Sequence, residues 1–264
     1  MASRKTHVGR RDFLIRSVWG AGLGLAWPGM SVGIPEPSPD DLAASTFESG
    51  GPVLLFQGDS ITDAGRARED RAPNHMPSLG SGYASLAAGR VLRQYPKRSW
   101  QCYNRGVSGN KVFQLADRWE TDCLDLSPTV LSILIGVNDF WHTLDGRYEG
   151  TVERYERDFR ALLRRTREAL PEVALLIGEP FALREGGHVN DRWYPTFDEY
   201  REAARRVAED FGASWIPYQS IFDEALEEAP ASYWAPDGVH PSLAGSALMA
   251  RGWVAAFQSV VEAK

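Results

Sequence analysis

The sequence predicts an α/β protein whose central sheet is parallel and covered by helices on both faces. Five short apolar runs alternate with longer stretches of helical spacing, which is typical of a doubly wound sheet. Two of the runs, "TVLSILIG" and "VALLIG", are almost continuously apolar, as strands buried on both faces are. The expected fold is therefore three-layer α/β/α, flavodoxin-like, with parallel strands at Val53–Gln57, Trp100–Asn104, Thr129–Ile135, Val173–Gly178 and Ser214–Pro217.

The stretches between these runs have the periodicity of amphipathic helices. Residues 151–170 and 197–211 place apolar side chains three or four positions apart, which predicts one buried face on each helix. Glu153 and Arg157 add an exposed i,i+4 pair on the first of them. A last helix is expected after Pro241, because proline fits the first helical turn.

The N-terminus has the order of an export signal. Arg10-Arg11 precedes a weakly apolar run without charge, from Ser17 to Gly33, and this order predicts a twin-arginine signal over residues 1–33. A disordered basic leader is the alternative. The run is too short and too rich in glycine for a comfortable membrane span, so none is expected in the mature form. Residues 34–51 are expected to be a linker, and 52–264 the catalytic domain, exported to the periplasm or outside the cell.

Charge restricts the partners of that domain. The chain has a formal charge of −6, and residues 1–33 hold five basic residues against one acidic residue, so the remainder carries −10. An acidic body argues against nucleic acid and anionic membranes as partners and suits a neutral substrate.

Two cysteines, Cys102 and Cys123, are too few for a disulfide framework or a zinc cluster, and whether they pair stays open.

Polar residues follow the predicted strands at the edge where ligands of such sheets bind. Ser60 follows the first strand, Gly109 the second and Asn138 the third, while Asp237 and His240 precede the last helix. Each has a structural alternative. Ser60 begins "SITD", which fits a helix cap, and the others fit tight turns.

Together these residues have the composition of an acyl-transfer site. A turn with Asp237 three residues before His240 can hold the carboxylate against Nδ1 and leave Nε2 free as a general base for Ser60. The negative oxygen of the reaction needs donors already in place. The backbone amide of Gly109 and the side-chain amide of Asn138 are such donors. One shared site explains all five residues better than separate turns.

The motifs "GDSIT", "NRGVSGN", "GVND" and "DGVHPS" resemble the four blocks of the SGNH (GDSL) hydrolase superfamily. The resemblance runs from about Val53 to the C-terminus. It implies that Ser60 is the nucleophile, that Asp237 and His240 complete the triad, and that Ser60, Gly109 and Asn138 form the oxyanion hole. Such a mechanism needs no cofactor and no metal.

Longer matches around these blocks resemble bacterial acetylxylan esterases of the superfamily. That resemblance implies removal of O-acetyl groups from xylan or xylo-oligosaccharides. Flat aromatic rings suit sugars, and Trp141 and Trp234 near the rim are the expected substrate contacts, with Asp59 beside the nucleophile. Aromatic residues of the core, or a contact between subunits of a homo-oligomer, are the alternatives.

Three other functions stay open at this stage. A lipid esterase, lysophospholipase or thioesterase on the same fold would prefer octanoyl to acetyl esters. Metal-dependent phosphoester hydrolysis could use Asp59, Asp139, His142 and His240, although no His-x-His or Glu-x-x-His pair is present. A non-catalytic glycan-binding module would bind xylan and turn over no ester.

Overall fold

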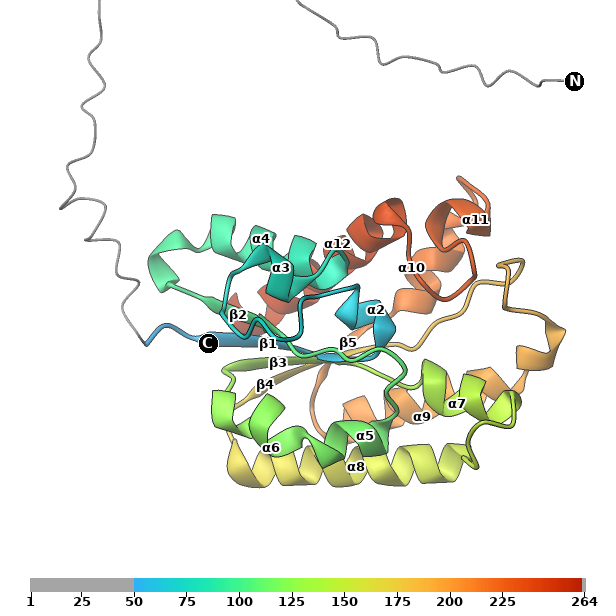
Figure 1. The fold of residues 1–264 in the computed structure, drawn as a ribbon, viewed down its shortest axis with the longest axis horizontal. Helices are drawn as coiled ribbons and strands as arrows, with labels where there is room; N and C mark the ends of the chain where they lie inside the picture. The colour runs from blue at the N-terminus through green and yellow to red at the C-terminus, as the bar shows by residue number, and fades with distance from the viewer. Residues whose placement is uncertain (1–49, 263–264) are drawn as a thin grey trace, which may run out of the picture. The chain divides into compact units, whose positions relative to one another are not determined.

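The sheet of the protein has five parallel strands in the order β2-β1-β3-β4-β5 (Figure 1). In the computed structural model, which describes residues 50–262, the strands are β1 (Val53–Gly58), β2 (Gln101–Asn104), β3 (Val130–Leu134), β4 (Ala174–Gly178) and β5 (Ser214–Ile216). The predicted fold class is therefore confirmed, and each predicted strand lies within one or two residues of the observed one.

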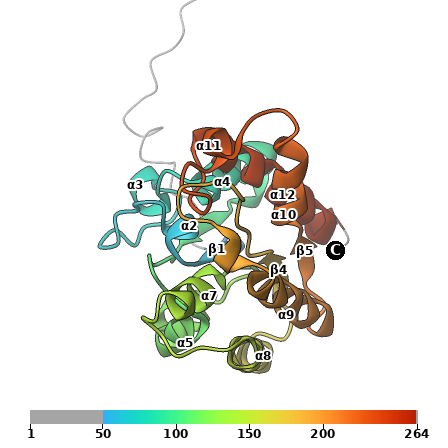
Figure 2. The same cartoon turned by 90° about the vertical axis from the view of Figure 1, so that its right-hand side faces the viewer.

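Helices cover both faces of the sheet, as the end-on view in Figure 2 shows. One face carries α4 (Tyr83–Gln94), α10 (Tyr218–Ala225) and α12 (Leu243–Glu262). The other face carries α5 (Val112–Asp117), α8 (Val152–Ala169) and α9 (Thr196–Asp210), with α6 (Trp119–Asp122) beside α5 in Figure 1. Shorter helices join these layers: α2 (Ser60–Asp63), α3 (Met76–Leu79), α7 (Val137–Leu144) and α11 (Ala231–Trp234). Single 3-10 turns occur at Pro96–Arg98, Leu124–Leu126 and Asp191–Trp193.

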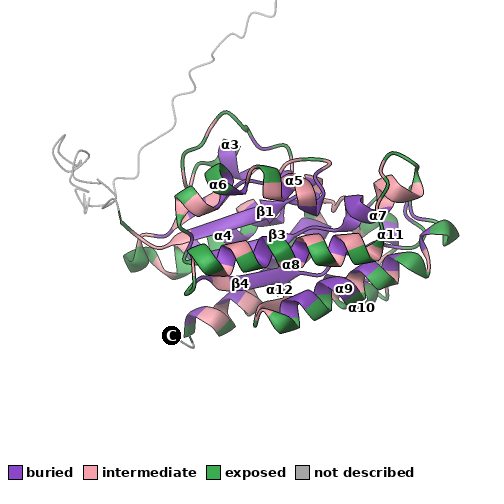
Figure 3. Ribbon diagram, turned by 90° about the horizontal axis from the view of Figure 1, so that it is seen from below, coloured by how far each residue is buried: buried purple, intermediate pink, exposed green. Residues whose placement is uncertain are grey.

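Burial follows the apolar patterns of the sequence. Every residue of β3 is buried, because helices pack on both sides of it (Figure 3). Helix α8 turns Tyr155, Phe159 and Leu163 into the core and its charged side to solvent. Buried polar groups find partners in the same core. On the other face of the sheet, Trp253 Nε1 of α12 donates to Ser132 Oγ of β3 at 2.8 Å.

The strand order places a switch point between β1 and β3. From β1 the chain crosses first to β2 on one side and then returns to β3 on the other, so the connections at the carboxyl ends of β1 and β3 diverge. A crevice forms where connections diverge, and ligands of doubly wound sheets bind in it. Ser60 follows β1 and Asn138 follows β3, so both lie beside this crevice.

Several expectations fall partly or wholly outside the described residues. The predicted export signal over 1–33 lies outside them, as does the predicted linker except for Gly50 and Gly51. Between residues 50 and 262, no helix combines the length and the apolar character needed to cross a membrane.

Cys102 and Cys123 are both buried free thiols, and burial raises the pKa of Cys102 to about 12.

Candidate active site

Ser60 lies at the start of α2, one residue after the helix cap. Asp59 is the N-cap residue, and its Oδ1 accepts the Ile61 amide at 3.0 Å. The capping role open to Ser60 is thus filled by its neighbour. The Ser60 hydroxyl instead lies 2.7 Å from His240 Nε2, although 180 residues separate the two in sequence. The geometry is that of a hydroxyl next to its general base.

Asp237 holds the other side of the imidazole. Its Oδ2 lies 2.6 Å from His240 Nδ1, while Oδ1 accepts the amides of Val239 at 2.9 Å and His240 at 2.7 Å. Three hydrogen bonds fix the orientation of this carboxylate. Two of them come from backbone amides of the turn, and the third involves the His240 ring. The neutral ring therefore carries its proton on Nδ1 and presents a lone pair on Nε2 to Ser60.

The two partners shift each other's pKa values in opposite directions. The hydrogen bond to Asp237 raises the pKa of His240 above its ordinary value, and this exceeds the opposing effect of burial. Burial alone would raise the pKa of Asp237, but the hydrogen bonds from the His240 ring and from the two amides hold it far below its ordinary value. Asp237 is thus a permanent carboxylate beside a ring whose protonated form it stabilises.

The predicted oxyanion donors follow β2 and β3, the strands on either side of β1. Gly109 has φ +81°, a conformation that favours glycine, on the loop after β2. Its amide and that of Ser60 donate to no other group among residues 50–262. Asn138, in the first turn of α7, gives one Nδ2 hydrogen to the Asn110 carbonyl at 3.3 Å. A carboxamide has two such hydrogens, so the second stays available for a ligand.

The predicted substrate contacts have mixed outcomes. Asp59 is fully buried and caps α2, and its contact with substrate stays a prediction. Burial raises its pKa to about 7. Trp141 is half-buried, with its ring centroid 5.4 Å from that of His188. Trp234 is also half-buried, and its Nε1 donates to the carbonyls of Ala225 and Ala229.

A cleft of about 430 Å³ opens at Ser60 and His240. Its walls are small or apolar and include Ile61, Ala64, Gly82 and Leu243. The side chain of Leu243 is 75% exposed at the mouth of the cleft, where a bound substrate could cover it. The cleft therefore combines a nucleophile, a base and a compact apolar wall.

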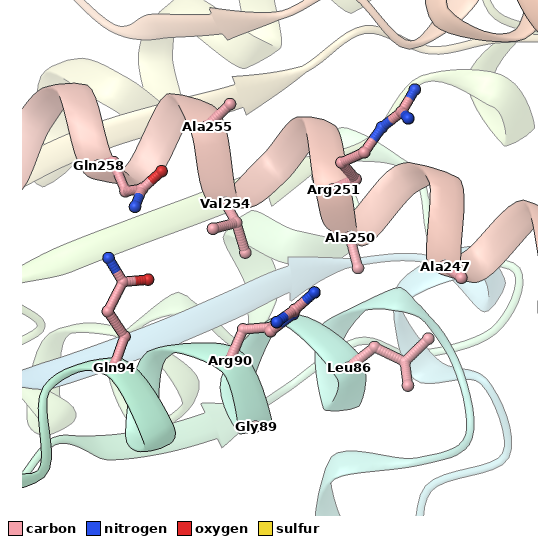
Figure 4. A pocket seen from close by; sticks show the side chains of 10 residues that line it. All are labelled: Leu86, Gly89, Arg90, Gln94, Ala247, Ala250, Arg251, Val254, Ala255 and Gln258. Atoms are coloured by element: carbon pink, nitrogen blue, oxygen red, sulfur yellow. The ribbon is translucent and has the colours of Figure 1, made fainter.

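A larger groove of about 680 Å³ lies elsewhere, between α4 and α12. In Figure 4 the side chains of the two helices face each other across it, with Leu86, Arg90 and Gln94 on α4 and Val254 and Gln258 on α12. Its lining contains no serine, histidine or carboxylate. Ser60 and His240 thus line the smaller cleft and not the larger groove.

The residues considered for a metal are not grouped as ligands. Within residues 50–262, no three His, Cys, Asp or Glu side chains gather in a way that could hold a metal ion. Asp139 is buried and accepts the Val112 amide with both carboxylate oxygens, at 3.2 and 3.3 Å. Burial lowers the pKa of His142 to about 4. Asp139 thus ties the first turn of α7 to the start of α5.

A doubly wound sheet that carries a hydrogen-bonded Ser–His–Asp chain at its carboxyl edge has the arrangement of a serine hydrolase. Comparison with known families agrees with that class. Residues 56–248 match the GDSL-like lipase/acylhydrolase family, and the chain belongs to this family. The resemblance expected from the four sequence blocks is confirmed.

Three comparisons with individual proteins show how similar the chain is to members of this family. The chain is 34% identical over 208 residues to an acetylxylan esterase of Geobacillus stearothermophilus, covering 77% of this chain and 93% of that protein. The crystal structure of that esterase superposes with a TM-score of 0.71 at 33% identity, over 78% of this chain and 94% of the other. A GDSL-like protein of Parabacteroides merdae is similar at 53% identity, with a TM-score of 0.77, over 78% and 95%.

Some residues around the site were not predicted from the sequence. Asp63 accepts the amide of Ser108, and Arg118 donates to the Asn110 side chain and the Arg105 carbonyl. The first contact joins residues 45 positions apart, and the other two join α6's cap to the loop after β2, so no periodic spacing predicts them. Asp63 belongs to the first block, "GDSITD", but its residue type alone does not indicate which amide it accepts.

Proposed function

We propose that the protein is a serine esterase that removes O-acetyl groups from carbohydrate, with xylan or xylo-oligosaccharides as the substrate class. The single observation that carries the chemistry is the continuous chain Ser60 Oγ–His240 Nε2 and His240 Nδ1–Asp237, at 2.7 and 2.6 Å. Its position at the switch point, beside free amide donors, supports acyl transfer to Ser60.

The proposed reaction proceeds in two halves. His240 Nε2 takes the hydroxyl proton as Ser60 Oγ bonds to the acetyl carbonyl carbon, and the Ser60 and Gly109 amides and the Asn138 side chain stabilise the oxyanion. The bond to the sugar oxygen then breaks, and His240 gives its proton to that oxygen. Acetyl-Ser60 remains. Water attacks it, His240 takes a proton from the water, and acetate leaves as Ser60 regains its proton.

Three observations favour an acetylated carbohydrate. The relative at 34% identity over most of the chain is an acetylxylan esterase. The cleft beside Ser60 is compact, which suits a short acyl group better than a long chain. Trp141, half-buried beside His188 and Trp193, offers an aromatic surface of the kind that packs on sugar rings.

The test is acetate release from acetylated xylo-oligosaccharides by wild type and Ser60→Ala. Loss of release in the variant, with intact folding by circular dichroism, is the expected result. Octanoate esters turned over faster than acetate esters would instead indicate a lipid esterase, lysophospholipase or thioesterase on the same active site.

We further propose that the N-terminal segment containing Arg10 and Arg11 directs export through a twin-arginine pathway. The pair precedes an uncharged and weakly apolar run, which is the arrangement such signals have. In cell fractionation, changing both arginines to lysine is expected to leave the protein in the cytoplasm. Equal export of wild type and variant would contradict the proposal.

A further inference from the structure

The helix that begins with Ser60 and the loop that carries Gly109 are packed backbone to backbone. Gly106 lies against the last turn of α2, where an added Cβ would come within 2.4 Å of the Asp63 amide nitrogen. No side chain fits at that separation. Asn104 Nδ2 also donates to the Thr62 carbonyl at 2.6 Å, while its Oδ1 accepts the Gly106 amide at 2.8 Å. The two segments therefore form one unit.

Asp63 provides the contact by which α2 reaches the residue next to Gly109. Its side chain is buried, and Oδ2 accepts the amide of Ser108 at 2.9 Å. Ser108 immediately precedes Gly109, and Asp63 is three residues after Ser60 in the same helix. One carboxylate thus connects the helix of the nucleophile to the residue before the oxyanion donor. Arg68 donates to the same oxygen from the solvent side.

Arginines fix the rest of the loop. Arg66 Nε donates to the Gly106 carbonyl at 2.8 Å. Arg118 Nη1 donates to the Arg105 carbonyl at 2.7 Å, and its Nε donates to Asn110 Oδ1 at 2.9 Å. These bonds hold the loop on both sides of Gly109. Asn104 also joins α2 to the loop, but at Gly106, whereas the bond from Asp63 joins α2 to the residue next to Gly109.

We propose that Asp63 is a positioning residue that sets the distance between the Gly109 amide and Ser60, and so aligns the two backbone donors of the oxyanion hole. The inference rests on the proposed esterase function. Preorganised donors stabilise the transition state only when they lie within about 0.5 Å of the productive geometry. Loss of one donor lowers kcat by roughly 10²–10³. Without Asp63 the loop keeps its other bonds, so the loss is expected to be smaller than that.

The test compares Asp63→Ala, Asp63→Asn and Arg68→Gln by steady-state kinetics on p-nitrophenyl acetate. Asp63→Ala removes the acceptor of the Ser108 amide, and kcat is expected to fall roughly 10- to 100-fold with KM changed less than about twofold. Asp63→Asn keeps an oxygen at the same place and is expected to retain most of kcat. Arg68→Gln is the control, because it removes the other partner of that oxygen and is expected to leave kcat unchanged.

The pH profile separates positioning of the donors from damage to the base. Since no hydrogen bond joins Asp63 to His240 or Asp237, the midpoint of the acidic limb of kcat/KM is expected to stay at the wild-type value in every variant. If Asp63→Ala does not fold, as thermal unfolding would show, Asp63→Glu replaces it. That variant keeps the charge, displaces the oxygen by one methylene, and is expected to lower kcat about tenfold.

Wild-type kcat in Asp63→Ala, or equal losses of kcat in Asp63→Asn and Asp63→Ala, would overturn the positioning role. A shifted pH midpoint would assign the effect to His240 instead. A failure of the proposed function would be seen in a different variant, as esterase activity retained by Ser60→Ala. The two failures are therefore distinguishable.

Discussion

Replacing Asp237 by asparagine tests how the imidazole is oriented. The carboxylate makes three hydrogen bonds, of which Oδ1 accepts two from backbone amides and Oδ2 faces His240 Nδ1 at 2.6 Å. Asparagine can keep the first two through its carbonyl oxygen. Its NH₂ group then points at Nδ1 and requires that nitrogen to accept. The ring proton moves to Nε2, which can no longer take the proton of Ser60.

The expected loss follows from that change of tautomer. A wrong tautomer in a Ser–His–Asp site lowers kcat by about 10⁴. At about 1.36 kcal/mol for each factor of ten, this loss corresponds to about 5.4 kcal/mol of transition-state stabilisation. The backbone of the turn is preserved, so the thermal unfolding midpoint of Asp237→Asn is expected to stay near that of wild type.

The assay is hydrolysis of p-nitrophenyl acetate between pH 4 and 9, with Asp117→Asn as the matched control. Asp117 is exposed at the end of α5, so the same change of chemistry there is expected to have no effect. Wild-type activity requires neutral His240, whose pKa is raised by its bond to Asp237. Activity is therefore expected to rise with pH through a midpoint above about 6.5. Asp237→Asn with more than a tenth of wild-type kcat and the same midpoint would refute the reasoning.

Two further variants test the oxyanion hole and the core. Asn138→Ala removes the side-chain donor and is expected to lower kcat by roughly 10²–10³ with little change in KM; wild-type kcat in this variant would remove Asn138 from the site. Trp253→Phe keeps an aromatic ring beside Phe257 but leaves Ser132 Oγ without its buried donor. A cost of about 1–3 kcal/mol is expected, measured as a lower denaturation midpoint, with kcat unchanged. An unchanged midpoint would show that this bond contributes little.

The sequence predicted the sheet well because its strands are short, apolar and evenly alternated with amphipathic helices. The continuous run in β3 indicates a strand covered on both faces, and all five of its residues are buried. The same pattern places Ser60 and Asn138 after strands that turn out to flank the switch point. The order of strands and helices along the chain was therefore sufficient to place Ser60 and Asn138 at the carboxyl ends of β1 and β3.

The directions of side chains explain what spacing did not predict. Asp59 was expected among the substrate contacts, and its fully buried side chain caps α2. Trp234 was expected at the substrate wall, and its indole nitrogen bonds the carbonyls at the end of α10. Asp63 accepts the amide of Ser108, which lies on a loop 45 residues further along the chain. Each side chain's direction depends on packing between elements, which one-dimensional periodicity does not contain.

The most direct measurement of the central claim is acetate release from acetylated xylo-oligosaccharides, made beside p-nitrophenyl acetate and octanoate, for wild type and Ser60→Ala. The account predicts that wild type releases acetate from the oligosaccharides, prefers acetate to octanoate, and loses both activities in Ser60→Ala. Release undiminished in Ser60→Ala would contradict the nucleophile. A preference for octanoate, without release from the oligosaccharides, would contradict the carbohydrate substrate and leave the triad in place.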